Sequence, residues 1–242
     1  MFAIFLKEIR SFFSSIIAYV VISVFLIANG IFLWIIPETS IFDYGYSTLN
    51  QLFEIAPWVF LFLIPAITMR LFAEERKSGT FEIILTKPVS DYSIILGKYF
   101  AGLALVIFSL LPTLLYFITV YLLSSPIGNM DIGGTWGSYL GLFFLGGIYV
   151  AIGVFASSIN DNQIISFIIS LFLCFFFYTL IDMLRTVTNI SPIDPVLDYL
   201  SINTHYMSIS RGVIDTRDIV YFISSIGFFI ILTKMVIEKR KW

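Results

Sequence analysis

The chain has 242 residues, of which 59% are hydrophobic and 12% are charged, with a formal net charge of −2. Because a typical soluble domain has about 25% charged residues, this composition excludes an ordinary soluble fold and indicates a protein that lies in a lipid bilayer. The charge balance gives no basis for binding nucleic acid. Cys174 is the only cysteine, so neither an intrachain disulfide nor a cysteine-based metal cluster is available.

The first 13 residues carry the pattern of an amphipathic helix. One stripe collects the apolar side chains Phe2, Phe5, Leu6, Ile9, Phe12 and Phe13. Lys7, Glu8 and Arg10 lie off this stripe, so we predict a helix that lies in the membrane interface. The alternative is that these residues extend the first membrane helix into the cytoplasm.

Six apolar segments follow, each close to the ~20 residues that a helix needs to cross the hydrocarbon. They cover residues 16–36, 57–72, 99–123, 136–157, 164–184 and 219–237. We therefore predict an all-α polytopic membrane protein in which residues 1–242 form a single transmembrane domain with six spans. Residues 186–218 are polar and form a predicted external stretch with room for partial helices, where we assign no role to His205.

Basic residues predict the orientation of the spans. They gather before the first span, between the second and third, and after the sixth, as Lys7, Arg10, Arg70, Arg76, Lys77, Lys87, Lys98, Lys234, Lys239, Arg240 and Lys241. With six spans these segments lie on one side, so the positive-inside rule places both termini in the cytoplasm. We expect a multi-pass protein of the cell inner (cytoplasmic) membrane.

Small residues recur at spacings of three and four along the fourth span. They are Gly137, Gly141, Gly146, Gly147, Ala151 and Gly153. Such spacing predicts close helix packing. The packing partner is either another helix of the same subunit or a second subunit.

Motifs for catalysis are absent from the sequence. A phosphate-binding loop needs Gly-x-x-x-x-Gly-Lys followed by Ser or Thr. The only Gly-Lys pair is Gly97-Lys98, with Tyr92 in place of the first glycine and Tyr99 in place of the hydroxyl residue. Neither His-Glu-x-x-His nor Gly-x-Ser-x-Gly occurs. We predict a subunit that is not an enzyme and binds no cofactor itself.

The connection between the second and third spans, residues 69–90, is patterned as two helical pieces. Ser78 or Thr80 is predicted to cap a short helix, which has Glu82 in its first turn and stops before Pro88. The apolar face of this helix comprises Phe81, Ile84 and Leu85. A short helix of this kind suits docking into a groove on another protein. The alternative is a solvated charge cluster at the end of a membrane helix.

The same loop resembles that of a known family. The matching residues are Pro65, Thr68, Met69, Arg70, Glu74, Glu75, Arg76, Ser78, Gly79, Thr80, Glu82, Leu85, Thr86, Pro88, Val89, Ser90, Gly97, Lys98 and Tyr99. They resemble the ABC-2 type permease family, and more narrowly the permease subunit of the gliding-motility ABC transporter, with permeases associated with nitrous-oxide reductase as relatives. The six spans, the amphipathic start and the external stretch agree, so the resemblance covers essentially the whole chain.

The resemblance implies the permease subunit of an ATP-driven transporter linked to gliding motility. Its partners would be a cytoplasmic ABC ATPase subunit, which holds ATP and Mg²⁺, and a second permease subunit in a homo- or heterodimer within the lipid bilayer. The implied coupling helix and its flank comprise Glu74, Glu75, Arg76, Lys77, Gly79, Thr80, Phe81, Glu82 and Leu85.

Within this segment, Glu74, Glu75 and Arg76 are expected to pair with charges on the ATPase or with the amino-terminal helix. Gly79 is expected to permit the tight change of direction. Two other functions stay open, namely a membrane anchor or assembly scaffold of a cell-surface machine, and an ATP-independent channel.

Overall fold

The computed structural model describes residues 1–86, 88–188 and 194–239, and the regular elements within these ranges are helices. Six helical segments among them are long and apolar enough to cross a membrane. They cover Ile16–Trp34, Asn50–Lys77, Asp91–Leu123, Ile132–Ile159, Gln163–Arg185 and Thr216–Glu238. The predicted all-α architecture with six spans is therefore confirmed.

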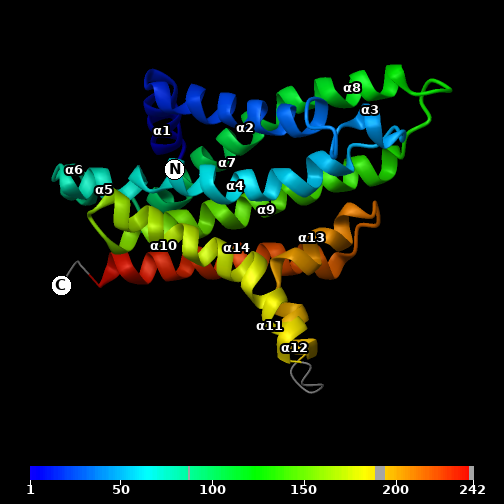
Figure 1. The fold of residues 1–242 in the computed structure, drawn as a ribbon. Helices are drawn as coiled ribbons and strands as arrows, with labels where there is room; N and C mark the ends of the chain where they lie inside the picture. Colours follow the sequence, from blue (N-terminus) through cyan, green and yellow to red (C-terminus); the bar gives the residue numbers. More distant parts are fainter. Residues whose placement is uncertain (87, 189–193, 240–242) are drawn as a thin grey trace.

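Three of the spans consist of several helical pieces (Figure 1). In chain order the elements are α1 (Phe2–Ser14), α2 (Ile16–Trp34), α3 (Ile41–Tyr44), α4 (Asn50–Thr68), α5 (Arg70–Lys77), α6 (Thr80–Leu85), α7 (Asp91–Leu110), the 3₁₀ turn η1 (Leu111–Thr113), α8 (Leu114–Leu123), α9 (Ile132–Ile159), α10 (Gln163–Phe175), the π-helical turn η2 (Phe176–Leu180), α11 (Ile181–Thr188), α12 (Asp194–Leu200), α13 (Ile202–Ser210) and α14 (Thr216–Glu238). The third span changes to a 3₁₀ turn at Pro112, because proline has no N–H to donate to the helix.

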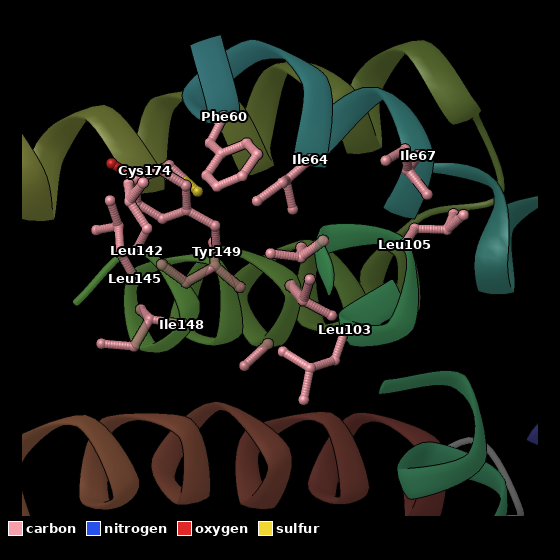
Figure 2. Packing of buried hydrophobic residues seen from close by; sticks show 14 of the residues in the cluster. Phe60, Ile64, Ile67, Leu103, Leu105, Leu142, Leu145, Ile148, Tyr149 and Cys174 are labelled. Atoms are coloured by element: carbon pink, nitrogen blue, oxygen red, sulfur yellow. The ribbon is translucent and has the colours of Figure 1, made fainter. Parts of the chain in front are cut away.

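α9 is the central helix of the bundle and packs against α4, α7, α10, α13 and α14. Figure 2 shows Leu142 and Tyr149 of α9 among apolar side chains of neighbouring helices, with Phe60, Ile64 and Cys174 nearby. These five side chains are buried. Because lipid is as apolar as the side chains, close van der Waals packing rather than transfer from water holds such helices together.

The glycines of α9 face neighbouring helices of the same chain. A Cβ added at Gly137 would lie 2.6 Å from the Ile209 carbonyl oxygen, and one at Gly146 would lie 2.6 Å from the Val106 side chain. α13 and α7 therefore approach α9 too closely for a larger residue. The small residues of the fourth span serve packing within the subunit.

The outer faces of the bundle are also apolar. On α2, Val21 and Phe25 are buried, whereas Val20, Val24 and Ile27 are exposed. A helix that is apolar on its exposed face is expected for a segment surrounded by lipid.

The two ends of the bundle differ in what they carry. α1, α5, α6 and the last turns of α14 lie together at one end, called the terminal end below (Figure 1). α3, the connection from α8 to α9, and α13 lie at the opposite end, called the distal end. Three residues that we used for the orientation, Lys87, Arg240 and Lys241, lie outside the described residues.

The predicted external stretch contains α12 and α13, while residues 189–193 lie outside the described part. α11 and α12 project sideways from the bundle (Figure 1). α13 instead packs against α9, and the buried Tyr206 donates its hydroxyl hydrogen to the Phe53 carbonyl at 2.6 Å. α13 is thus part of the packed core at the distal end.

Candidate functional site

α1 is a separate helix that crosses the terminal end of the bundle (Figure 1). Ser15 has an extended backbone (φ −104°, ψ 157°), so α1 ends before α2 begins. The alternative in which residues 1–13 simply extend the first span is therefore wrong. Gly97 of α7 allows α1 to approach, because a Cβ there would lie 2.9 Å from the Ile4 side chain.

The apolar stripe of α1 is divided between the bundle and its surroundings. Phe12 is buried, and the Arg70 guanidinium lies 5.2 Å from the centre of its ring. Phe5, Leu6 and Ile9 are partly buried, whereas Phe2 is exposed. The stripe therefore anchors α1 to the bundle from Phe5 onward, and Phe2 remains on the outside.

Four charged side chains from three helices meet under α1. This charged junction comprises Lys7 and Glu8 of α1, Glu75 of α5 and Lys98 of α7. The Lys98 Nζ atom lies 2.8 Å from Glu8 Oε1 and 2.8 Å from Glu75 Oε2, and it donates to the Leu71 carbonyl at 2.5 Å. Lys7 contacts Glu8 at 3.1 Å and also contacts Glu75. The junction ties the amino-terminal helix to the second and third spans.

The junction is mostly buried, with Lys98 0% exposed. Burial acts to raise the pKa of Glu8, but attraction by Lys98 and Lys7 outweighs it and holds that pKa below its ordinary value of 4.5. Burial acts to lower the pKa of Lys7, but its bonds to Glu75 and Glu8 outweigh that effect and raise the pKa above 10.5. Lys7 and Glu8 are therefore both ionised at neutral pH.

Sequence reasoning did not find Glu8 or Lys98 as site residues. Lys98 stands among basic residues that we counted outside the membrane, and Glu8 lies off the apolar stripe that drew attention to α1. Glu75 faces the amino-terminal helix, which is one of the two partners expected for it. The available signal was a lone acidic residue between Lys7 and Arg10 in an otherwise apolar helix.

The start of α5 is held by α9. Helical hydrogen bonding is interrupted at Met69, so the first backbone amides of α5 need other acceptors. The Ser157 hydroxyl of α9 accepts from the amides of Phe72 at 2.9 Å and Ala73 at 3.1 Å, and donates to the Met69 carbonyl at 2.9 Å. One buried hydroxyl therefore fixes α5 to the central helix.

Gly79 forms the turn between α5 and α6 with a left-handed backbone (φ 70°, ψ 2°), as its predicted role requires. The hydroxyls of Ser78 and Thr80 donate back to the carbonyls of Glu74 at 2.9 Å and Glu75 at 3.2 Å. The prediction that Ser78 or Thr80 caps α6 is therefore wrong. Gly79 occupies the cap position, and the two hydroxyls instead complete the end of α5.

α6 packs on α5 through Phe81. This side chain is buried, with its ring edge-to-face against Phe72 at 5.7 Å and the Arg76 guanidinium 5.3 Å from its centre. Arg76 also lies 3.9 Å from Asp161, in the connection between α9 and α10. Phe81 and Arg76 therefore lie between α6 and the rest of the bundle and hold α6 in place.

The outward surface of α5 and α6 is formed by other side chains. The exposed ones on these two helices are Glu74, Lys77, Thr80, Glu82 and Ile83. Ile83 is 60% exposed, whereas the predicted contact residue Ile84 is partly buried. The side chain of Leu85 lies outside the described part. Among the described side chains of α5 and α6, the exposed apolar one is thus Ile83, which has charges of both signs around it.

Comparison with protein families identifies the family of the chain. Residues 2–237, nearly the whole chain, match the family described as ABC-2 family transporter protein. No curated protein matches the chain.

Proposed function

Because the chain belongs to the ABC-2 family of transporter proteins, we propose that it is the membrane-spanning subunit of a transporter driven by a separate cytoplasmic ATPase. Members of this family are membrane components and are typically not catalytic. The observation that supports the proposal is the rigid attachment of α6, through α5, to the helices that cross the membrane.

Movement of a partner against α6 would reach the membrane by two routes. α6 is locked to α5 by Phe81 and Arg76. α5 is joined to the central helix by Ser157 and to α7 and α1 by the charged junction. Because both connections are direct contacts, a displacement of α6 would move α5 together with α9, α7 and α1.

The surface offered to the ATPase is small and amphipathic. Ile83 supplies an apolar anchor, and Glu74, Lys77 and Glu82 supply charges around it. An apolar side chain ringed by polar groups is the usual form of a binding hot spot, because the rim excludes water from the anchor. Glu75, Arg76 and Phe81 act behind this surface and position it.

The orientation and the partners complete the proposal. The terminal end faces the cytoplasm, with both termini there, in the cell inner membrane. ATP and Mg²⁺ are held by the ATPase, and a second permease, identical or different, completes the membrane pathway.

Similarity to the gliding-motility permeases extends the proposal to a cell-surface machine for movement over solid surfaces. Disruption of the gene in its own host would then abolish surface motility, and the wild-type gene would restore it. Unchanged motility would remove this extension and leave the transporter assignment intact.

The experiment that tests the docking surface uses substitutions on α6. Ile83→Asp and Glu82→Lys are expected to reduce co-purification of the ATPase and the stimulation of its ATP hydrolysis by about tenfold or more, as loss of a hot spot does. Glu38→Lys, an exposed charge reversal near the distal end of α2, is the matched control and is expected to behave as wild type. If the α6 variants retained both properties, α6 would not be the docking surface.

A further inference from the structure

A pocket of about 450 Å³ opens at the distal end, away from the charged junction. It lies between the start of α4, the π-helical turn η2 with α11, and α13. The lining side chains come in pairs four residues apart, which places both members of a pair on the same helical face. The pairs are Glu54 with Trp58, Tyr178 with Asp182, Thr179 with Met183, and Asn203 with Met207.

The pocket has a negative charge that its own lining does not neutralise. Glu54 and Asp182 are its two ionisable carboxyl groups, and no ion pair to either is found within the described residues. Arg185, one turn beyond Asp182 on α11, is paired with Asp198 at 2.5 Å. A cation would therefore find two carboxylates and no competing basic side chain in the lining.

Several polar atoms at the pocket lack a partner. Tyr178 is 5% exposed, and no hydrogen bond from its hydroxyl occurs within the described part of the chain. Its hydroxyl is close enough to Asp182 and Glu54 for all three to interact electrostatically. A largely buried tyrosine whose hydroxyl lines a pocket without a protein partner leaves that hydroxyl for a ligand or bound water there.

Asn203 also has a side-chain atom without a partner, and the orientation of its amide group is defined. Its amide nitrogen donates to Asp182 Oδ2 at 2.6 Å, and because a carboxylate can only accept, the amide oxygen must be the other atom. That oxygen, Asn203 Oδ1, is buried and has no partner among the described residues, as is true of Thr179 Oγ1. Unused acceptors beside two carboxylates favour a ligand that donates hydrogen bonds.

Aromatic side chains complete the chemistry. The rings of Trp58 and Tyr178 stand edge-to-face, with centres 5.8 Å apart and planes at 88°, so they form two walls at a right angle. Trp58 is 45% exposed. Trp and Tyr faces attract organic cations, and two such walls with nearby carboxylates are the usual elements of ammonium recognition.

We infer that this pocket is a binding site for an organic ammonium ion that carries an alkyl or aryl group. The ammonium group would lie between Glu54 and Asp182 against Trp58, and the apolar part would lie on Met183 and Met207, whose flexible side chains adapt to different shapes. A metal ion fits this lining less well, because among the described residues no group of three or more His, Cys, Asp or Glu side chains is placed to hold one.

Binding can be measured on the purified full-length chain in dodecyl maltoside micelles, which carry no ammonium group, without an ATPase, so its result does not depend on the proposed coupling function. The probe is benzylammonium, which is protonated at neutral pH and donates hydrogen bonds, with benzyl alcohol as the neutral analogue, measured by calorimetric titration. Saturable, one-site binding of the cation but not of the alcohol is expected. Glu54→Gln, which changes an exposed side chain, and Trp58→Leu are each expected to weaken it about tenfold.

Glu38→Gln is the matched control, because it removes an exposed carboxylate from the same end of the bundle outside the pocket. It is expected to leave the affinity unchanged. Three results would overturn the assignment, namely no saturable binding of the cation, equal affinity for the alcohol, or wild-type affinity in both pocket variants.

Discussion

Removal of the Lys98 ammonium group is the sharpest test of the charged junction. Lys98→Met keeps the length of the side chain but leaves the buried carboxylates of Glu8 and Glu75 with only Lys7, which is half exposed, to compensate them. At 2.8 Å and an effective dielectric constant of about 20, each lost contact represents about 6 kcal/mol of gross attraction. Desolvation offsets much of this, and breaking a buried pair costs about 3–5 kcal/mol net.

The assay is hydrogen–deuterium exchange of the α1 amides together with reversible unfolding in mixed detergent. A loss of about 3 kcal/mol corresponds to roughly 100-fold more frequent detachment of α1, since about 1.4 kcal/mol is a factor of ten. The triple variant Lys98→Met, Glu8→Gln and Glu75→Gln is the control, because replacing a whole buried ion network is often neutral. Wild-type stability in the single variant would refute the reasoning, and a triple variant as unstable as the single one would assign the effect to packing.

Three further outcomes follow from the terminal end. Ser157→Ala leaves two buried amides of α5 without an acceptor and is expected to cost about 1–3 kcal/mol in unfolding, whereas Ser224→Ala, on an exposed part of α14, is expected to cost under about 0.5 kcal/mol. In Gly79→Ala the added methyl group meets no neighbour, but the residue must keep a positive φ. The substitution is therefore expected to lower the free energy of unfolding by about 1–2 kcal/mol and to lower ATPase stimulation. An unchanged free energy of unfolding would contradict the left-handed turn. The pKa of Glu8 is lowered on folding, so its contribution to the free energy of unfolding is complete above pH 4.5 and is lost as the pH falls through the lowered pKa. The pKa of Lys7 is raised on folding, so its contribution is complete below pH 10.5 and is lost as the pH rises through the raised pKa. Thermal unfolding as a function of pH should therefore show an acid limb that Glu8→Gln flattens, and an unchanged acid limb would contradict the pairing.

The spans were predictable because their signal is local. A run of about 20 apolar residues forms a membrane helix whatever its neighbours are, since every backbone group must be satisfied within the segment. The start of the second span was placed too late, at residue 57, because Pro57 reads as a boundary although the helix begins at Asn50. The separate amphipathic helix was likewise visible in the periodicity of residues 1–13.

The site was less predictable because it depends on distances between helices. Lys98 and Glu8 are 90 residues apart in the sequence, and nothing in either segment indicates that they touch at 2.8 Å. Periodicity also does not say which side of a six-residue helix faces the bundle. Phe81 was therefore expected on the docking face, whereas it is buried against α5. The distal pocket shows the same limit, since its four pairs at a spacing of four are visible along the chain but their convergence is not.

Site-specific photo-crosslinking from position 83 tests the central claim most directly. A photoreactive residue in place of Ile83, in membranes of the native host, is expected to give a crosslinked product that contains a phosphate-loop ATPase, whereas the same residue at Glu38 is expected to give none. A product from position 38 but not from position 83, or none from either, would contradict the assignment of α6 as the contact between this subunit and its ATPase.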